Sequence, residues 1–267
     1  MTNTDWVRVS KQMPCPICGK PDWCLISKTG DSVICPRTPS DKPIGDAGFL
    51  HDTTTLFVQP DPPAREPERP AVDWRPHTDR CSAAMSSSQW EFIVRSLGLP
   101  QRYLQVLGLG WSAKAGAYTF PMKNHEGQVV GVRLRYPDGK KLSAKGSKAG
   151  LFMADKVDTD GVLLVAEGPT DTAALMTTGH QVVGRPSCNG GTNFVYQMIS
   201  WRTSLVIVAD NDKPGKEGAK RLAEICKCKT KSVKIIIPRK GSDAKDWLGH
   251  GLNRATLDLM IHQASPE

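Results

Sequence analysis

The chain has 267 residues and a formal net charge of +8, so it can bury a sizeable core, and its charge favours a polyanionic partner. No apolar run approaches the roughly 18 to 20 residues of a membrane span, and the N-terminus lacks the apolar core of a signal peptide. We therefore expect a cytoplasmic protein with no membrane partner, whose eight cysteines are metal ligands or buried thiols and not a disulfide framework.

The N-terminal piece, 1–55, contains four cysteines within 21 residues, in CPICGKPDWCLISKTGDSVIC. Cys15 and Cys18 have the spacing that lets two thiolates face one tetrahedral zinc ion, and Cys24 and Cys35 could complete a four-thiolate site. Short strands around WCLIS and SVIC, joined by the turn-like KTGD, predict a zinc ribbon that metal binding would stabilise. Buried cysteines without a metal are the plainer alternative.

We expect a proline-rich linker at 56–78, because its stretch PDPPAREPERPAVDWRP contains six prolines and no hydrophobic periodicity. A small α+β piece follows at 79–158. Its segment SSSQWEFIVRSLGLPQRYLQVLGLGW predicts two short helices, the first capped by a serine and broken near Gly98 and Pro100. The next segment, from AYTFPM to KAGLF, predicts antiparallel strands with turns at HEG and PDG.

The second half of this piece concentrates positive charge. Residues 123–148 hold seven Lys or Arg and two acids, a balance of +5. A run of charges is usually only a solvated face. Arg133 and Arg135, however, share one face of a predicted strand, which favours a focused phosphate-binding patch.

Acidic side chains follow three predicted strands. The stretch VLLVAEGPTD runs an apolar strand directly into Glu167 and Asp171, and its lack of polar alternation indicates burial on both faces, as in parallel sheets. The stretch SLVIVADNDKPG repeats this design with Asp210 and Asp212, which point the same way as residues i and i+2 of an extended segment. A third strand, SVKIIIP, is followed by Asp243 and Asp246.

These carboxylates predict a site for a divalent cation. Two like charges about 4 Å apart repel by roughly 1 to 4 kcal/mol, and a cation removes that repulsion. Hard oxygen ligands with no nearby His or Cys suit magnesium or manganese. Ligands in open α/β sheets gather at the carboxyl ends of the strands, where all three acidic clusters fall. A single cluster could simply be favourable acids at a helix start, but three in succession argue for a site.

The pattern Glu-Gly-x-x-Asp, then Asp-x-Asp, then a late Asp-x-x-Asp helix resembles the Toprim domain over about 160–262. The resemblance implies an α/β fold with a Rossmann-like parallel sheet at 159–267. It also implies that Mg²⁺ or Mn²⁺ binds at Glu167, Asp210 and Asp212, with Asp171 and Asp243 as further catalytic acids.

A ribbon, a linker, a basic subdomain and then Toprim, in that order, resembles bacterial and phage DNA primases. The resemblance implies a nucleotidyltransferase that makes short RNA primers from NTPs on single-stranded DNA by two-metal chemistry, with structural Zn²⁺ in the ribbon. Thr38 stands where those proteins have another cysteine, so His51 is an alternative ligand to Cys24. The implied nucleotide- or template-binding residues are Arg133, Arg135, Lys141, Lys145 and Lys148.

Other functions remain open. A Toprim nuclease would use the same acids to activate water, a RecR-like mediator would bind DNA without catalysis, and a degenerate primase would act as a loader. The basic sheet argues against the first, and the intact acid set argues against the other two. The chain lacks a GxxxxGK[ST] phosphate loop, so either the protein works alone or it recruits a separate helicase or polymerase. A small replicon such as a phage, plasmid or integrated element would be a natural source of such a protein.

Overall fold

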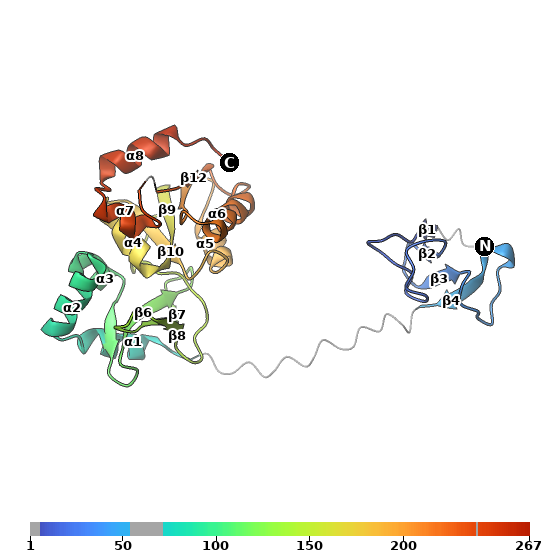
Figure 1. Cartoon of the computed structure of the whole chain (residues 1–267), viewed down its shortest axis with the longest axis horizontal. Helices are drawn as coiled ribbons and strands as arrows, with labels where there is room; N and C mark the ends of the chain where they lie inside the picture. Colours follow the sequence, from blue (N-terminus) through green and yellow to red (C-terminus); the bar gives the residue numbers. More distant parts are fainter. Residues whose placement is uncertain (1–5, 54–71, 239) are drawn as a thin grey trace. The chain divides into compact units, whose positions relative to one another are not determined.

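The computed structural model describes residues 6–53, 72–238 and 240–267. The chain divides into two compact units, Met1–Ala71 and Val72–Glu267, and each has a core of its own (Figure 1). Most of the expected linker, 56–71, lies outside the described residues. None of the described helices is long and apolar enough to cross a membrane.

The first unit is a small antiparallel sheet in the strand order β1-β2-β3-β4. Its elements are β1 Trp6–Arg8, β2 Leu25–Ser27, β3 Ser32–Cys35, the 3-10 helix η1 Gly45–Ala47 and β4 Phe49–Asp52. The two predicted strands correspond to β2 and β3, and Gly30, with a φ of +75°, lies in the turn between them. Among the described residues, its core cluster holds three aliphatic side chains, Val9, Ile26 and Val33, beside three cysteines, and Ile34 is buried as well.

Three short helices open the second unit: α1 Arg75–Ala83, α2 Ser87–Leu97 and α3 Gln101–Val106. The sequence predicts α2 and α3. Ser86 begins α2 with a capping box, and Gly98 ends it in the left-handed conformation. Helix α1 differs from expectation, because it begins inside the segment assigned to the linker. Pro76 lies in its first turn, where a missing N–H costs no hydrogen bond.

The predicted antiparallel strands form a sheet in the order β5-β6-β7-β8. Its strands are β5 Gly110–Ser112, β6 Ala117–Lys123, β7 Val129–Arg135 and β8 Lys141–Ser143. The turns at HEG and PDG connect β6 to β7 and β7 to β8, and their glycines have φ values of +83° and +92°. In this register Arg135 lies opposite Lys141, so two cationic residues meet at one end of the hairpin.

A parallel sheet in the order β10-β9-β11-β12 forms the rest of the unit. Its strands are β9 Gly161–Glu167, β10 Gln181–Arg185, β11 Thr203–Val208 and β12 Ser232–Ile236. The helices are α4 Gly168–Met176, α5 Thr192–Met198, α6 Lys213–Cys226, α7 Ala244–Gly249 and α8 Arg254–Gln263. The expected α/β class, with a parallel sheet and a small antiparallel N-terminal unit, is confirmed.

Strand β9 shows why its sequence lacks polar alternation. Leu164 and Ala166 pack with α4 and α7, in a core that also includes α2, α3 and β6. Leu163 and Val165 pack on the opposite face with α5 and α6 (Figure 1). Because helices cover both faces of the sheet, each of these positions is apolar. The antiparallel sheet shares the first of these two cores, which fixes it against the carboxyl ends of the parallel strands.

Candidate functional site: a pocket of acids and cations, and a cysteine cluster

The acids predicted at strand ends converge because of the strand order. β9 and β11 are neighbours, with Val165 paired to Ile207, so the residues that follow each strand emerge side by side. Glu167 ends β9, and Asp210 follows β11. Both line a pocket of about 440 Å³, together with Asp171 and Asp243.

Helix starts orient several of these carboxylates. Asp212 caps α6 by accepting a hydrogen bond from the Gly215 N–H at 2.7 Å, and Asp243 caps α7 by accepting from the Asp246 N–H at 2.7 Å. Asp171, in the first turn of α4, is buried and accepts from the Lys245 N–H at 3.0 Å. The plainer alternative, acids that serve as helix caps, therefore holds for two of the predicted residues. Capping also fixes the side chain of Asp243 where it lines the pocket.

The pocket accumulates negative charge. Burial, then the charges of Asp171 and Glu167, raise the pKa of Asp210 to about 7. Burial, then the charge of Asp243, raise the pKa of Asp171 to about 7. Burial also raises the pKa of Glu167, although the positive charge of Arg185 opposes it. Each shift reports that ionised carboxylates are disfavoured here without a compensating cation.

The donor set fits a hard divalent cation. The described residues that line the pocket offer carboxylates and no histidine or cysteine. Among the described residues, the four cysteines are the group of three or more possible metal ligands that lie close together, and the pocket carboxylates form no such group. Oxygen-only ligands match magnesium or manganese, and a cation would offset the repulsion among the acids.

Cationic side chains of the antiparallel sheet form the other side of the pocket. Arg133 and Arg135 of β7 and Lys141 of β8 all line it. Arg135 is partly buried, and burial lowers its pKa. Arg133 Nη2 donates to the carbonyl of Pro186 at 2.9 Å, which ties β7 to the loop after β10. The structure thus brings one sheet's cations against the other sheet's acids.

Three predicted residues lie outside this lining. Asp212 does not line the pocket, although its charge contributes to the raised pKa of Asp210. Lys145 and Lys148 do not line it either, because they follow β8 in a segment that leads away through a hydrogen bond from the Lys148 N–H to the Val130 carbonyl. Their predicted role in nucleotide or template binding stays a prediction.

Two cations at the site were not identified from the sequence. Lys245, at the start of α7, lines the pocket. The sequence pattern in this segment pointed to its acidic neighbours and not to this lysine. Arg185 ends β10 opposite Glu167 in register, is 2% exposed and donates to the Cys188 carbonyl. Its Nε has no hydrogen-bond partner among the described residues. Strand β10 was itself missed, since Gly184 and two polar ends interrupt a short apolar run.

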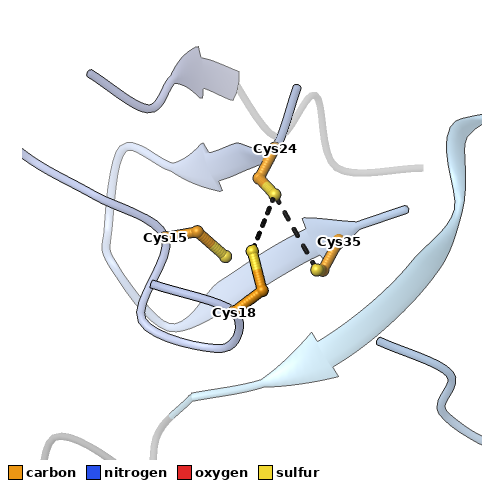
Figure 2. Close-up of side chains that lie close together, drawn as sticks. All are labelled: Cys15, Cys18, Cys24 and Cys35. Atoms are coloured by element: carbon orange, nitrogen blue, oxygen red, sulfur yellow. Dashed lines mark hydrogen bonds between the residues drawn. The ribbon is translucent and has the colours of Figure 1, made fainter. Parts of the chain in front are cut away.

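The four cysteines of the first unit gather around one point (Figure 2). Their sulfurs all lie within 4.8 Å of one another, and Cys24 Sγ lies 3.7 Å from Cys18 Sγ and 3.8 Å from Cys35 Sγ. His51 Nε2 instead lies 3.0 Å from the Thr38 carbonyl, so Cys24 and not His51 completes the group.

The cluster is suited to a soft, tetrahedral ion. Burial acts to raise the pKa of Cys18, but a hydrogen bond from the Lys20 N–H and the neighbouring sulfurs lower it to about 7. Burial and then the neighbouring sulfurs raise the pKa of Cys24, although Arg37 Nη1 lies 3.7 Å from its Sγ. Four cysteines on short strands are a ligand set that fits structural zinc.

Residues 162–253 match the family model described as the Toprim domain. The C-terminal part of this chain is a Toprim domain. No curated protein sequence matches the chain. The fold is similar to a structure of the zinc-binding and RNA polymerase domains of Aquifex aeolicus primase, with a TM-score of 0.58, 17% identity, and coverage of 71% of this chain and 60% of that chain.

Two further structures extend the likeness. A DnaG primase catalytic domain bound to ssDNA has a TM-score of 0.57 and 13% identity, covering 72% of this chain and 77% of that one. The primase fragment of the bacteriophage T7 primase-helicase has a TM-score of 0.50 and 16% identity, covering 96% of this chain and 99% of that one. The Toprim match, these folds and the four-cysteine cluster fit a ribbon-plus-Toprim primase architecture.

Proposed function

We propose that this protein is a DNA primase that makes short RNA primers on single-stranded DNA from nucleoside triphosphates. The observation that carries the proposal is one pocket in which Toprim carboxylates face the cations of the antiparallel sheet. Nucleotide transfer needs both, because the catalytic metal requires anionic ligands and the triphosphate requires cationic ones. The fold likeness to primase cores supports the same function.

The acids would hold the catalytic metal. Glu167 and Asp210, with Asp212 beside them, would bind one or two Mg²⁺ or Mn²⁺ ions. Bound metal would lower the pKa of the primer 3′-hydroxyl and neutralise triphosphate charge. The 3′-oxygen then attacks the α-phosphate in line, and pyrophosphate leaves. Asp171 and Asp243, held by their hydrogen bonds to α7, would keep the negative potential high around these ligands.

The cationic side chains of β7 and β8 would bind the phosphates of the nucleotide or template. Arg135 offers a fork of N–H donors, and its partial burial strengthens its hydrogen bonds to phosphate. Lys141, opposite it in register, would add a second positive charge. Arg133 would act largely as a brace, since it already donates to the Pro186 carbonyl.

The first unit would contribute template contact. We infer that Cys15, Cys18, Cys24 and Cys35 hold one zinc ion, which would stabilise a unit with little apolar core. One structural neighbour is a primase domain bound to ssDNA, and we propose the same class of template here. A separate helicase or polymerase would be its partner in replication.

A primer-synthesis assay tests the proposal. The protein is incubated with single-stranded DNA, Mg²⁺ and labelled NTPs, and the products are separated on a denaturing gel. New short oligonucleotides that disappear in Asp210→Asn support a primase. Shortened input DNA would instead indicate a nuclease that uses the same acids, and neither product would indicate a binding module.

A further inference from the structure

Trp23, beside the cysteine cluster, adopts an unusual backbone conformation. Its φ is +66°, and among the described residues it is the one non-glycine with a positive φ. A Cβ atom strains this left-handed conformation, which glycine adopts freely and asparagine tolerates. Its side chain is also 74% exposed, so the indole recovers little of that strain by packing.

The backbone conformation of Trp23 can be explained by the position of Cys24, but its indole side chain cannot. Trp23 directly precedes Cys24, whose carbonyl accepts from the Val9 N–H at 3.2 Å and whose sulfur lies 3.7 Å from Cys18 Sγ. The left-handed turn therefore brings Cys24 into the cluster. Glycine would make the same turn with less strain, so the fold of the unit does not explain a large aromatic side chain here.

The charges around Trp23 would admit a phosphate backbone. The acid next to it, Asp22, pairs with Arg37, whose Nη1 also donates to the Asp22 carbonyl at 2.8 Å. The negative charge of this sequence neighbour is thus compensated, and Lys20, three residues before Trp23, is exposed. Single-strand binding surfaces combine exposed aromatic side chains with positive charge, and Trp23 and Lys20 supply one of each.

We propose that Trp23 stacks on an unpaired base of single-stranded DNA and thereby holds the template on the cysteine-rich unit. The inference rests on the proposed function, since it names the side chain through which this unit would contact its template. Stacking uses the π-face that every base has, so Trp23 would supply affinity with little preference for sequence.

The test compares full-length, zinc-loaded variants for binding of a fluorescent single-stranded oligonucleotide by anisotropy. Trp23→Gly suits a φ of +66° and should keep its zinc and its melting temperature. Its affinity should fall about 5- to 150-fold, which corresponds to the ~1 to 3 kcal/mol of one stacked base. Trp23→Phe should recover most of that loss. Trp201→Ala is the matched control, because Trp201 is 75% exposed in the other unit.

Trp23→Gly that binds with wild-type affinity would overturn the inference, as would an equal loss in Trp201→Ala. Should Trp23→Gly lose zinc, Trp23→Asn tolerates the same conformation, and its affinity at matched zinc content decides the question in the same way. The proposed function fails separately: wild type that makes no primers yet binds DNA more tightly than Trp23→Gly would refute the primase and leave the stacking intact.

Discussion

Asp210→Asn should stabilise the protein in the absence of divalent metal. A rise in the Asp210 pKa from 3.8 to about 7 corresponds to at most ~4 kcal/mol of strain in the ionised state, at about 1.36 kcal/mol per pKa unit. Asp210 is only partly buried and shares this strain with Glu167 and Asp171, so we expect ~1 to 2 kcal/mol. Asparagine keeps the shape of the side chain and removes the charge.

The sign of the pH dependence follows from the direction of the shift. Because the Asp210 pKa is higher in the folded protein, the folded state binds more protons than the unfolded state between about pH 4 and 7. Wild-type stability should therefore fall as pH rises through this window. The advantage of Asp210→Asn should be near zero at pH 4 and complete above pH 7.

Thermal melts in buffer without added divalent metal measure this effect. At pH 8 the variant should melt about 2 to 8 °C above wild type, since 1 kcal/mol moves the midpoint by roughly 2 to 4 °C in a unit of this size. Mn²⁺ at 100 times its Kd should stabilise wild type by ~2.7 kcal/mol, and Asp210→Asn should lose most of that gain. Glu126→Gln, an exposed acid in the β6–β7 turn, is the control and should change neither result.

Asp210→Asn that melts below wild type at pH 8, or that keeps the full gain from Mn²⁺, would contradict a cation site at this carboxylate. Either result would mean that the carboxylate stabilises the fold and does not serve a cation.

Three further changes probe other parts of the account. Cys15→Ser or Cys18→Ser should reduce about one zinc per chain to none by elemental analysis, and wild type purified without chelator that holds no zinc would refute the cluster assignment. Arg135→Ala should weaken binding of single-stranded DNA and reduce the slope of log affinity against log salt by roughly 0.7. Lys145→Ala, outside the pocket, should reduce both affinity and slope less, and a larger effect of Lys145→Ala than of Arg135→Ala would contradict the assigned geometry. Gly215→Ala should lower the melting temperature, because an added Cβ would lie 2.8 Å from the carbonyl oxygen of Asp210, and an unchanged midpoint would refute that packing.

Much of the second unit could be predicted because its sequence signals are local. Five apolar residues ending at Glu167 indicated a strand buried on both faces, and the helices α5 and α6 on one side and α4 and α7 on the other explain that pattern. Ser86 and Gly98 marked the ends of α2 with side-chain and backbone chemistry that does not depend on tertiary contacts.

The missed elements depend on context. Helix α1 is poor in periodic apolar residues, and its proline suggested a linker until Thr78 and Cys81 proved to be buried. Strand β10 is stabilised by its parallel pairing with β9, and a local sequence pattern does not encode that pairing. Arg185 was missed with it, because its relation to Glu167 exists only across that pairing.

The cysteine cluster shows the same contrast. The spacing of Cys15 and Cys18 predicted one half of a metal site, whereas the choice between Cys24 and His51 required the fold. Strand β4 directs His51 to the Thr38 carbonyl, and the turn at Trp23 directs Cys24 to the other sulfurs.

The carboxylates of the pocket should be required for the synthesis of new RNA on a DNA template. Supplying NTPs labelled on the γ-phosphate tests it most directly, because only the first nucleotide of a newly started chain keeps that label. Wild type with single-stranded DNA and Mg²⁺ should give short labelled oligonucleotides, and Glu167→Gln, with a melting temperature at or above that of wild type, should give none. Labelled products that persist in Glu167→Gln, or a wild type that makes none under conditions where it binds the DNA, would contradict the account.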